Sequence, residues 1–407
     1  MSTPAMDEPL LSVRGFRNLF LAGAVSQLGS QISYVALPLL AVTALGAGAG
    51  EVGLLAALGT LTVLLLGLPA GAWVDRVRRR PVMIATDLLR AGALLSIPVA
   101  WWGGWLSMGQ LYLVAVLVGA GTLLFDVASY SIVPALVGRE RLTAANTLLV
   151  GTGAGMDVAG RSAAGVLVQV AGAPVAILLD ALSYLWSAAW LRGVAEPRTT
   201  AREPDPMGRR IAEGVRFLFG NPILVTALLQ GTMANLAFPL CSVLLPVVIV
   251  RQLGQPEWVL GAYLAVGGLG VLAGSSSAHA IGRRLGTGRA AWLTSLVTTP
   301  AAIVVPFLSA GGPWVWASAV AWFVLTFRTG LNNVLLVSLR QRVTPDAMLG
   351  RMTATMRLLL TGALGAGGLL AAAVGELWGT GPALALGAAV MALSWLPYVR
   401  SPLRHEP

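Results

Sequence analysis

The sequence predicts an all-α polytopic membrane protein with twelve transmembrane helices. Of its 407 residues, 56% are hydrophobic and only 11% are charged, whereas a soluble domain carries about a quarter charged residues. Segments without any charged residue recur along the whole chain. They are long enough for the roughly 20 apolar residues that a helix needs to cross a bilayer core of about 30 Å. Clusters of arginine separate these segments, as they do in the loops of membrane proteins.

The apolar segments also place the individual helices. Windows without a charged residue cover 18–50, 52–74, 91–125, 217–250, 258–282, 290–327 and 377–399. With the arginine clusters as markers of the loops, we expect helices at 17–43, 51–72, 82–103, 108–132, 143–170, 174–192, 221–249, 257–279, 289–309, 313–339, 350–375 and 381–399. Tryptophans fall at one set of helix ends, where a membrane helix meets water. These are Trp101, Trp102, Trp105, Trp258, Trp314, Trp316 and Trp378.

The positions of the arginines predict the topology. All 27 basic residues are arginine, and the net charge is +10. They gather in one set of loops, whereas the alternate connections at 101–109, 171–174 and 309–313 contain none. Cytoplasmic loops carry this excess, so we expect the arginine-rich loops and both termini in the cytoplasm and the chain in the plasma membrane. The positive charge then reflects topology and weak contact with anionic lipids, and no nucleic-acid partner is expected.

The residues that carry most enzyme chemistry are scarce. The chain has two histidines and one cysteine, Cys241, which lies inside an apolar segment. Their spacing with the acidic residues indicates neither a metal-ligand set nor a nucleophile site. We therefore expect no catalytic residues, no metal site and no cofactor. A polytopic sensor or enzyme is the weaker alternative to a transporter.

A polar segment at 196–217 divides the chain near its midpoint. Its first half is typical of a flexible linker, and from Met207 onward the apolar spacing predicts an amphipathic helix on the cytoplasmic face. We expect an N-terminal six-helix bundle at 1–193, a cytoplasmic linker with this helix at 194–219, and a C-terminal six-helix bundle at 220–407.

The two halves resemble each other weakly. The segment at 71–80 aligns with 274–284, and the segment at 137–146 aligns with 343–352. Such internal symmetry is typical of parallel six-helix repeats in transporters.

The segment GAWVDRVRRRP lies between the second and third expected helices. Its order of Gly, three residues, Asp-Arg and then a basic pair resembles the signature loop of the major facilitator superfamily. The matching residues are Gly71, Asp75, Arg76, Arg79 and Arg80. The stretches FRNLFLAGAVSQLGS, ATDLLRA, LLDALSYLWSAAWL and EGVRFLFGNP are similar to the branch that includes bacterial macrolide-efflux and enterobactin-exporter proteins. This resemblance implies two six-helix bundles around a central cavity, which rock to open it to alternate sides of the membrane.

The resemblance also implies that the signature loop acts as a gate. Asp75 would face the positive amino end of the eleventh helix, which begins near Gly350, and would bias the equilibrium between two conformations. Arg79 or Arg80 would pair with Asp126 near the inner end of the fourth helix. The alternative is that these arginines only fix the topology.

Three charged residues lie in the middle of expected helices. Asp157 and Arg161 are one turn apart in the fifth helix, so they can neutralise each other on one face. A lone charge at that depth costs about 2.5–3.5 kcal/mol on insertion scales. Asp157 could be a protonation site, or Arg161 could bind an anionic group of the cargo; the alternative is a static ion pair. Arg328 has no acidic residue within a turn, so we expect it to face the cavity or a distant carboxylate and to serve coupling or cargo binding.

Uncharged polar residues lie on the first, seventh and tenth helices, which line the cavity in this family. They are Gln27, Gln31, Tyr34, Asn235, Asn332 and Asn333. Among apolar walls they suit an amphipathic organic molecule, although each also suits a hydrogen bond between helices. We therefore predict a monomeric secondary transporter that exports a small organic compound, such as a drug or natural product, by alternating access in exchange for protons. An importer or facilitator of a small metabolite is the alternative.

Overall fold

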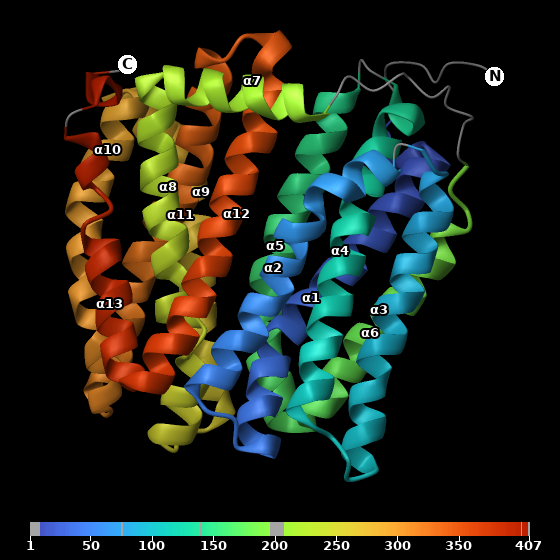
Figure 1. Cartoon of the computed structure of the whole chain (residues 1–407), viewed down its shortest axis with the longest axis vertical. Coiled ribbons are helices and arrows are strands. Elements are labelled where there is room, and N and C mark those ends of the chain that lie inside the picture. Colours follow the sequence, from blue (N-terminus) through green and yellow to red (C-terminus); the bar gives the residue numbers. More distant parts are fainter. Residues whose placement is uncertain (1–8, 75, 139–140, 196–206, 400, 406–407) are drawn as a thin grey trace. The chain divides into compact units, whose positions relative to one another are not determined.

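The structure, a computed structural model, describes residues 9–74, 76–138, 141–195, 207–399 and 401–405 (Figure 1). Within these residues every regular element is a helix. The contacts divide the chain into two compact units. Unit 1 comprises Met1–Leu45 and Thr62–Arg202, and unit 2 comprises Gly46–Leu61 and Glu203–Pro407. The boundary at 202 falls in the expected linker, while the first part of the second membrane helix groups with unit 2.

Six long helices form the first half of the chain. They are α1 (Arg14–Leu45), α2 (Ala49–Val74), α3 (Arg79–Trp102), α4 (Met108–Val137), α5 (Leu142–Ala171) and α6 (Ala173–Leu191). Helix α6 packs against both α1 and α3, and α1 also packs against α5. One face of α6 is therefore enclosed by its neighbours, and its buried residues include Asp180, Ser183, Tyr184 and Ser187.

The second half repeats this arrangement with more irregular helices. Its membrane elements are α8 (Pro222–Ser242) with the π-helical segment Pro246–Gln252, α9 (Glu257–Leu285), α10 (Thr287–Thr298) with the 3₁₀ segment Thr299–Ala310, α11 (Pro313–Val343), α12 (Asp346–Leu377), and α13 (Thr380–Ala392) with the 3₁₀ turn Leu396–Tyr398. Proline stands near the start of each of the irregular segments. Proline cannot donate the backbone hydrogen bond that a regular helix needs.

Eleven of these membrane elements, counted over the described residues, are long and apolar enough to cross a bilayer. Helix α5, with 30 residues, is the twelfth long helix. The predicted all-helical class and the number of membrane helices are thus confirmed. The largest difference in a boundary is at α9, which continues to Leu285 instead of ending at 279. No glycine in a left-handed conformation stops it before Gly286, and Arg283 and Arg284 in its last turn interact favourably with the helix dipole.

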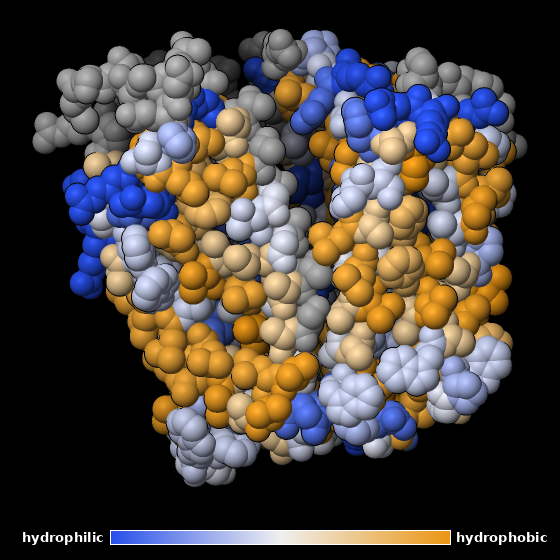
Figure 2. Space-filling model, turned by 180° about the vertical axis from the view of Figure 1, so that it is seen from behind, coloured by the Kyte–Doolittle hydropathy of each residue, from blue (hydrophilic) through white to orange (hydrophobic). Residues whose placement is uncertain are grey.

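The surface of the helices matches a membrane environment. Figure 2 shows apolar side chains over much of the sides of the helices, whereas most of the strongly hydrophilic side chains lie toward their ends. The seven tryptophans expected at helix ends are all at least 42% exposed. An indole at the edge of a membrane can keep its ring in the apolar region and its N–H in water.

Helices α9 and α11 approach each other at their backbones. Gly274 lies against the carbonyl of Phe327, and Gly330 lies against the carbonyl of Val271. A Cβ atom at either glycine would overlap these backbone atoms. In a membrane, small residues permit such close packing because lipid supplies no hydrophobic drive for helix association.

The segment from Met207 forms helix α7 (Met207–Gly220), which lies across the ends of α8 and α12 in unit 2 (Figure 1). Leu218 is fully buried against these helices, whereas Phe219 is 57% exposed. Glu213 accepts a hydrogen bond from Arg351 within an ion pair that joins α7 to α12. Gly214 meets the carbonyl of Arg351, so the two helices touch closely at this point. The helix is thus amphipathic, with one face on the bundle.

Candidate functional site

Helices α1 and α5 bring three of the predicted site residues together in unit 1. The Arg161 Nε donates a hydrogen bond to the Gln31 Oε1 at 2.8 Å. The guanidinium of Arg161 also lies over the ring of Tyr34, 5.0 Å from its centroid. A Cβ at Gly160 would lie 2.6 Å from the Cβ of Gln31, so this glycine permits the close approach of the two helices. Tyr34 is 48% exposed, so the cluster is open to a ligand or to solvent.

The predicted partner of Arg161 is Asp157, whose side chain is not described. The backbone of Asp157 belongs to α5, one turn before Arg161, and nothing is described of its side chain. Gln27 lies one turn before Gln31 on α1 and is half-buried. The pairing of Asp157 with Arg161 therefore stays a prediction.

The predicted gate is described only in part. Asp75 lies outside the described residues, and the burial of Gly71 and Gly350 is not described. Arg80 donates a hydrogen bond to the carbonyl of Arg192, at the end of α6, where helix carbonyls lack an internal partner.

The structure describes the exposure of the other residues of the predicted gate. Arg76 is exposed, Arg79 is half-buried, and Asp126 is half-buried on α4. The pairing of Asp126 with Arg79 or Arg80 stays a prediction.

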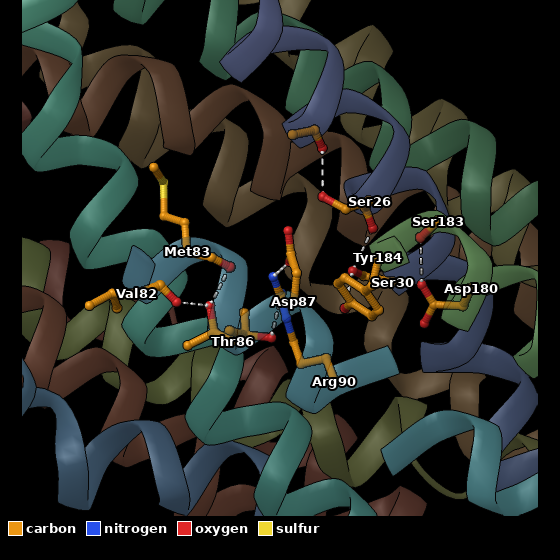
Figure 3. A network of polar contacts seen from close by, with 12 residues as sticks. Ser26, Ser30, Val82, Met83, Thr86, Asp87, Arg90, Asp180, Ser183 and Tyr184 are labelled. Atoms are coloured by element: carbon orange, nitrogen blue, oxygen red, sulfur yellow. Dashed lines mark hydrogen bonds and ion pairs between the residues drawn. The ribbon is translucent and has the colours of Figure 1, made fainter. Parts of the chain in front are cut away.

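A buried ion pair that the sequence analysis did not single out lies in the middle of α3. Arg90 pairs with Asp87, one turn earlier, and the two are 3% and 0% exposed (Figure 3). The guanidinium of Arg90 lies 4.1 Å from the ring centroid of Tyr184 and 4.7 Å from that of Phe125. Its Nη1 donates to the Thr122 Oγ1 at 3.3 Å. The cation is thus held by one carboxylate, two aromatic rings and a hydroxyl.

A second carboxylate belongs to the same polar network. Asp180 on α6 is fully buried and accepts a hydrogen bond from the Ser183 Oγ at 3.1 Å. Arg90 attracts it electrostatically. The Tyr184 hydroxyl lies 2.7 Å from the Ser30 Oγ, which connects the network to α1 (Figure 3).

The network joins four helices of unit 1 around its charges. Within the described residues, the second oxygen of each carboxylate, that of Asp87 and that of Asp180, has no hydrogen-bond partner. The guanidinium of Arg90 therefore has to balance two acidic groups.

The sequence did contain a signal for this network. Asp87 and Arg90 are an acid and a base three residues apart, inside the helix expected at 82–103. Opposite charges at this spacing face each other on a helix. The segment ATDLLRA was used only as a mark of family resemblance, so the pair was missed.

Arg328 is enclosed within unit 2. Its side chain is 1% exposed, its Nη2 lies 2.9 Å from the Met391 Sδ, and its Nη1 donates to the Ser394 Oγ at 3.3 Å. Tyr398 is close enough to interact with it electrostatically. In the described part of the chain, no carboxylate pairs with Arg328 and its Nε has no partner. The side chain therefore joins α11 to Met391 on α13, and its predicted role in coupling or cargo binding stays a prediction.

The three predicted asparagines have different surroundings. Asn235 on α8 donates from Nδ2 to the carbonyl of Leu360 on α12 at 3.1 Å. Asn332 is buried, and its Nδ2 lies 3.4 Å from the Ser295 Oγ on α10. Asn333 is exposed. Asn332 therefore serves the packing of helices, whereas Asn235 also borders a pocket.

This pocket lies between α8, α11 and α12 and has a volume of about 310 Å³. It is lined by Asn235, Val337, Arg340, Gln341, Met352, Thr353, Arg357, Leu360, Thr361 and Leu364. The Arg340 Nε donates to the carbonyl of Leu336 at 3.1 Å, and its Nη1 lies 2.6 Å from the Met356 Sδ. Arg357 is exposed on the wall of the pocket. The sequence alone does not single out either arginine, because Arg340 belongs to a cluster that is typical of a cytoplasmic loop and Arg357 follows it closely.

Comparison with known proteins gives the family of the chain. Residues 19–368 match the profile of the Major Facilitator Superfamily. The multidrug efflux pump Tap of Mycolicibacterium fortuitum is 30% identical over 360 residues, which are 83% of each chain. The multidrug efflux pump Tap of Mycobacterium tuberculosis is 26% identical over 71% of each chain. Among solved structures, a bacterial homologue of the iron transporter ferroportin in an inward-facing state superimposes with a TM-score of 0.75. It is 19% identical, over 97% of this chain and 99% of that one, which shows a common fold.

Proposed function

Because the chain belongs to the major facilitator superfamily and is a transporter, not an enzyme, we propose that it exports a small organic compound by alternating access in exchange for protons. The observation that carries the proposal is the likeness to a multidrug efflux pump along most of both chains. A drug or a natural product is the cargo class that this likeness supports. The proton gradient then supplies the energy, and no cofactor takes part.

The membrane location of the protein follows from its helices and its relatives. The helices make the chain a multi-pass membrane protein, and its bacterial relatives point to the plasma membrane. We place both termini and the arginine-rich loops in the cytoplasm because of the bias in positive charge. We further propose that the protein works as a monomer among membrane lipids.

Export is tested in a bacterial host stripped of its own pumps. Cells that express the chain are expected to accumulate less of at least one toxic compound from a resistance panel than cells with the empty vector. A protonophore is expected to abolish the difference, because it removes the driving gradient. Greater accumulation in the expressing cells would instead support an importer, and equal accumulation of every compound would contradict transport of this class.

We propose Asp157 as the residue that carries the proton, since it lies in the middle of α5 next to the Arg161 cluster. Asp157→Asn cannot exchange a proton, so gradient-driven export is expected to fall to the level of the empty vector. Exchange of labelled cargo without a gradient is expected to persist, which separates coupling from binding. Glu257→Gln, at the start of a membrane helix, is the matched control and should transport normally. Full gradient-driven export by Asp157→Asn would assign coupling to another carboxylate.

A further inference from the structure

The pocket between α8, α11 and α12 contains two arginines without an ion-pair partner in the described part of the chain. Among the described residues, Arg340 contacts a carbonyl and a thioether, and Arg357 has no ion-pair partner. Two other arginines on membrane helices have a carboxylate partner: Arg90 pairs with Asp87, and Arg351 pairs with Glu213. The charge in the pocket is therefore available for a ligand.

Arg357 lies within the membrane-spanning part of α12. It is six residues after Arg351, where the apolar span Arg351–Leu377 begins, which corresponds to about 9 Å along the helix. An arginine in a membrane segment is costly unless it faces a polar cavity or a partner. With low-dielectric walls on both sides, a guanidinium attracts an anion much more strongly than it does in water. A carboxylate, sulfonate or phosphate can also accept two parallel hydrogen bonds from it.

The remaining walls of the pocket suit an organic molecule. Val337, Met352, Leu360 and Leu364 supply apolar surface, while Asn235, Gln341, Thr353 and Thr361 supply uncharged hydrogen-bonding groups. The volume of about 310 Å³ is at the lower end of the range for small-molecule sites. An inorganic ion would leave the apolar surface unused. An amphipathic compound would contact both kinds of wall.

From the two uncompensated guanidiniums and the apolar walls beside them, we propose that this pocket binds the cargo, and that the cargo is an amphipathic organic anion. The inference rests on the proposed function, which it narrows from small organic compounds to those with an acidic group. Arg340 and Arg357 hold the acidic group, and the aliphatic side chains of α11 and α12 hold the apolar body.

Binding is tested on the purified full chain in a neutral detergent by fluorescence polarisation. The two probes are fluorescein, an organic anion at neutral pH, and rhodamine 123, a cation with the same ring system. Wild type is expected to bind fluorescein. Arg340→Gln and Arg357→Gln are each expected to weaken its binding by about tenfold or more, as for the loss of a hydrogen bond between charged groups. The same variants are expected to bind rhodamine 123 no more weakly than wild type does.

Arg342→Gln is the matched control, because Arg342 lies two residues after Arg340 and donates to the Thr287 Oγ1 at 2.7 Å, outside the pocket. Its fluorescein affinity should equal that of wild type. Absence of fluorescein binding to wild type, or unchanged binding by both pocket variants, would overturn the proposal. Displacement of fluorescein by phosphatidylglycerol vesicles, with no fluorescein export from cells, would also overturn it, because the occupant is then a lipid.

Different results would contradict the anion-binding pocket and the proposed export. A chain that exports cationic compounds in a gradient-dependent way but does not bind fluorescein is still an exporter, with another cargo class. A chain that binds fluorescein through Arg340 and Arg357 but lowers the accumulation of no compound has the pocket without the proposed export.

Discussion

Arg90→Leu is expected to lower the stability of the protein by about 3–5 kcal/mol, the usual cost of removing one partner of a buried ion pair. The substitution removes the guanidinium that balances Asp87 and attracts Asp180, and both carboxylates are fully buried. Leucine also replaces the cation that lies between the rings of Tyr184 and Phe125. The expected result is a large loss of monodisperse protein in fluorescence-detected size exclusion and a clearly lower melting temperature.

Two further variants separate this electrostatic cost from the general effect of a new leucine. Arg78→Leu, an exposed arginine just before α3, should change stability by less than about 1 kcal/mol. Asp87→Leu combined with Arg90→Leu removes both members of the ion pair, so it should be more stable than Arg90→Leu alone. If Arg90→Leu melts at the wild-type temperature, the network does not stabilise unit 1.

The positions of the helices could be predicted because each membrane segment has to be continuously apolar. The ends of α5 and α6 lie within one residue of the expected ones for this reason, although neither helix has a side-chain cap at its N-terminus. The extension of α9 to Leu285 shows the limit of the method. Hydropathy marks where a helix leaves the lipid, whereas the helix ends where the backbone turns, here at Gly286.

The contacts between helices could be predicted less well, because they depend on how each helix is rotated about its axis. The sequence placed Gln31 and Tyr34 on the first helix and Arg161 on the fifth, and the structure brings these three together. The sequence does not show which of two neighbouring asparagines is buried. In the structure Asn332 packs against α10, whereas Asn333 is exposed. A one-residue step turns a side chain by about 100° around a helix, so such choices need the packing itself.

The charges illustrate the same limit. Asp87 and Arg90 are close in sequence, so their pairing follows from local helix geometry. Arg328 has no such neighbour, and its contacts with Met391 and Ser394 lie more than 60 residues away. Only these tertiary contacts show that the cation is enclosed in the bundle.

Gly330→Ala is expected to destabilise unit 2 by about 3 kcal/mol, the upper part of the range for overpacking. Its new Cβ would lie 2.8 Å from the carbonyl carbon of Val271 and closer still to the oxygen. These are backbone atoms, so no rotation of a side chain can relieve the overlap, and α9 and α11 have to separate. Alanine favours a helix over glycine by up to about 1 kcal/mol, so any loss of stability comes from this contact. The measurement is the melting temperature of the purified protein.

Two other glycines provide the controls for this interpretation. Gly381 has no atom within 4 Å of its Cβ position, so Gly381→Ala should leave the melting temperature unchanged or raise it. At Gly231 the nearest atom is the Leu360 Cδ2 at 2.8 Å, the end of a side chain that can rotate, so Gly231→Ala should cost little. The order of stability, with Gly330→Ala clearly lowest, follows from whether the neighbour is backbone or side chain. Equal melting temperatures for all three variants would mean that α9 and α11 do not depend on direct backbone contact.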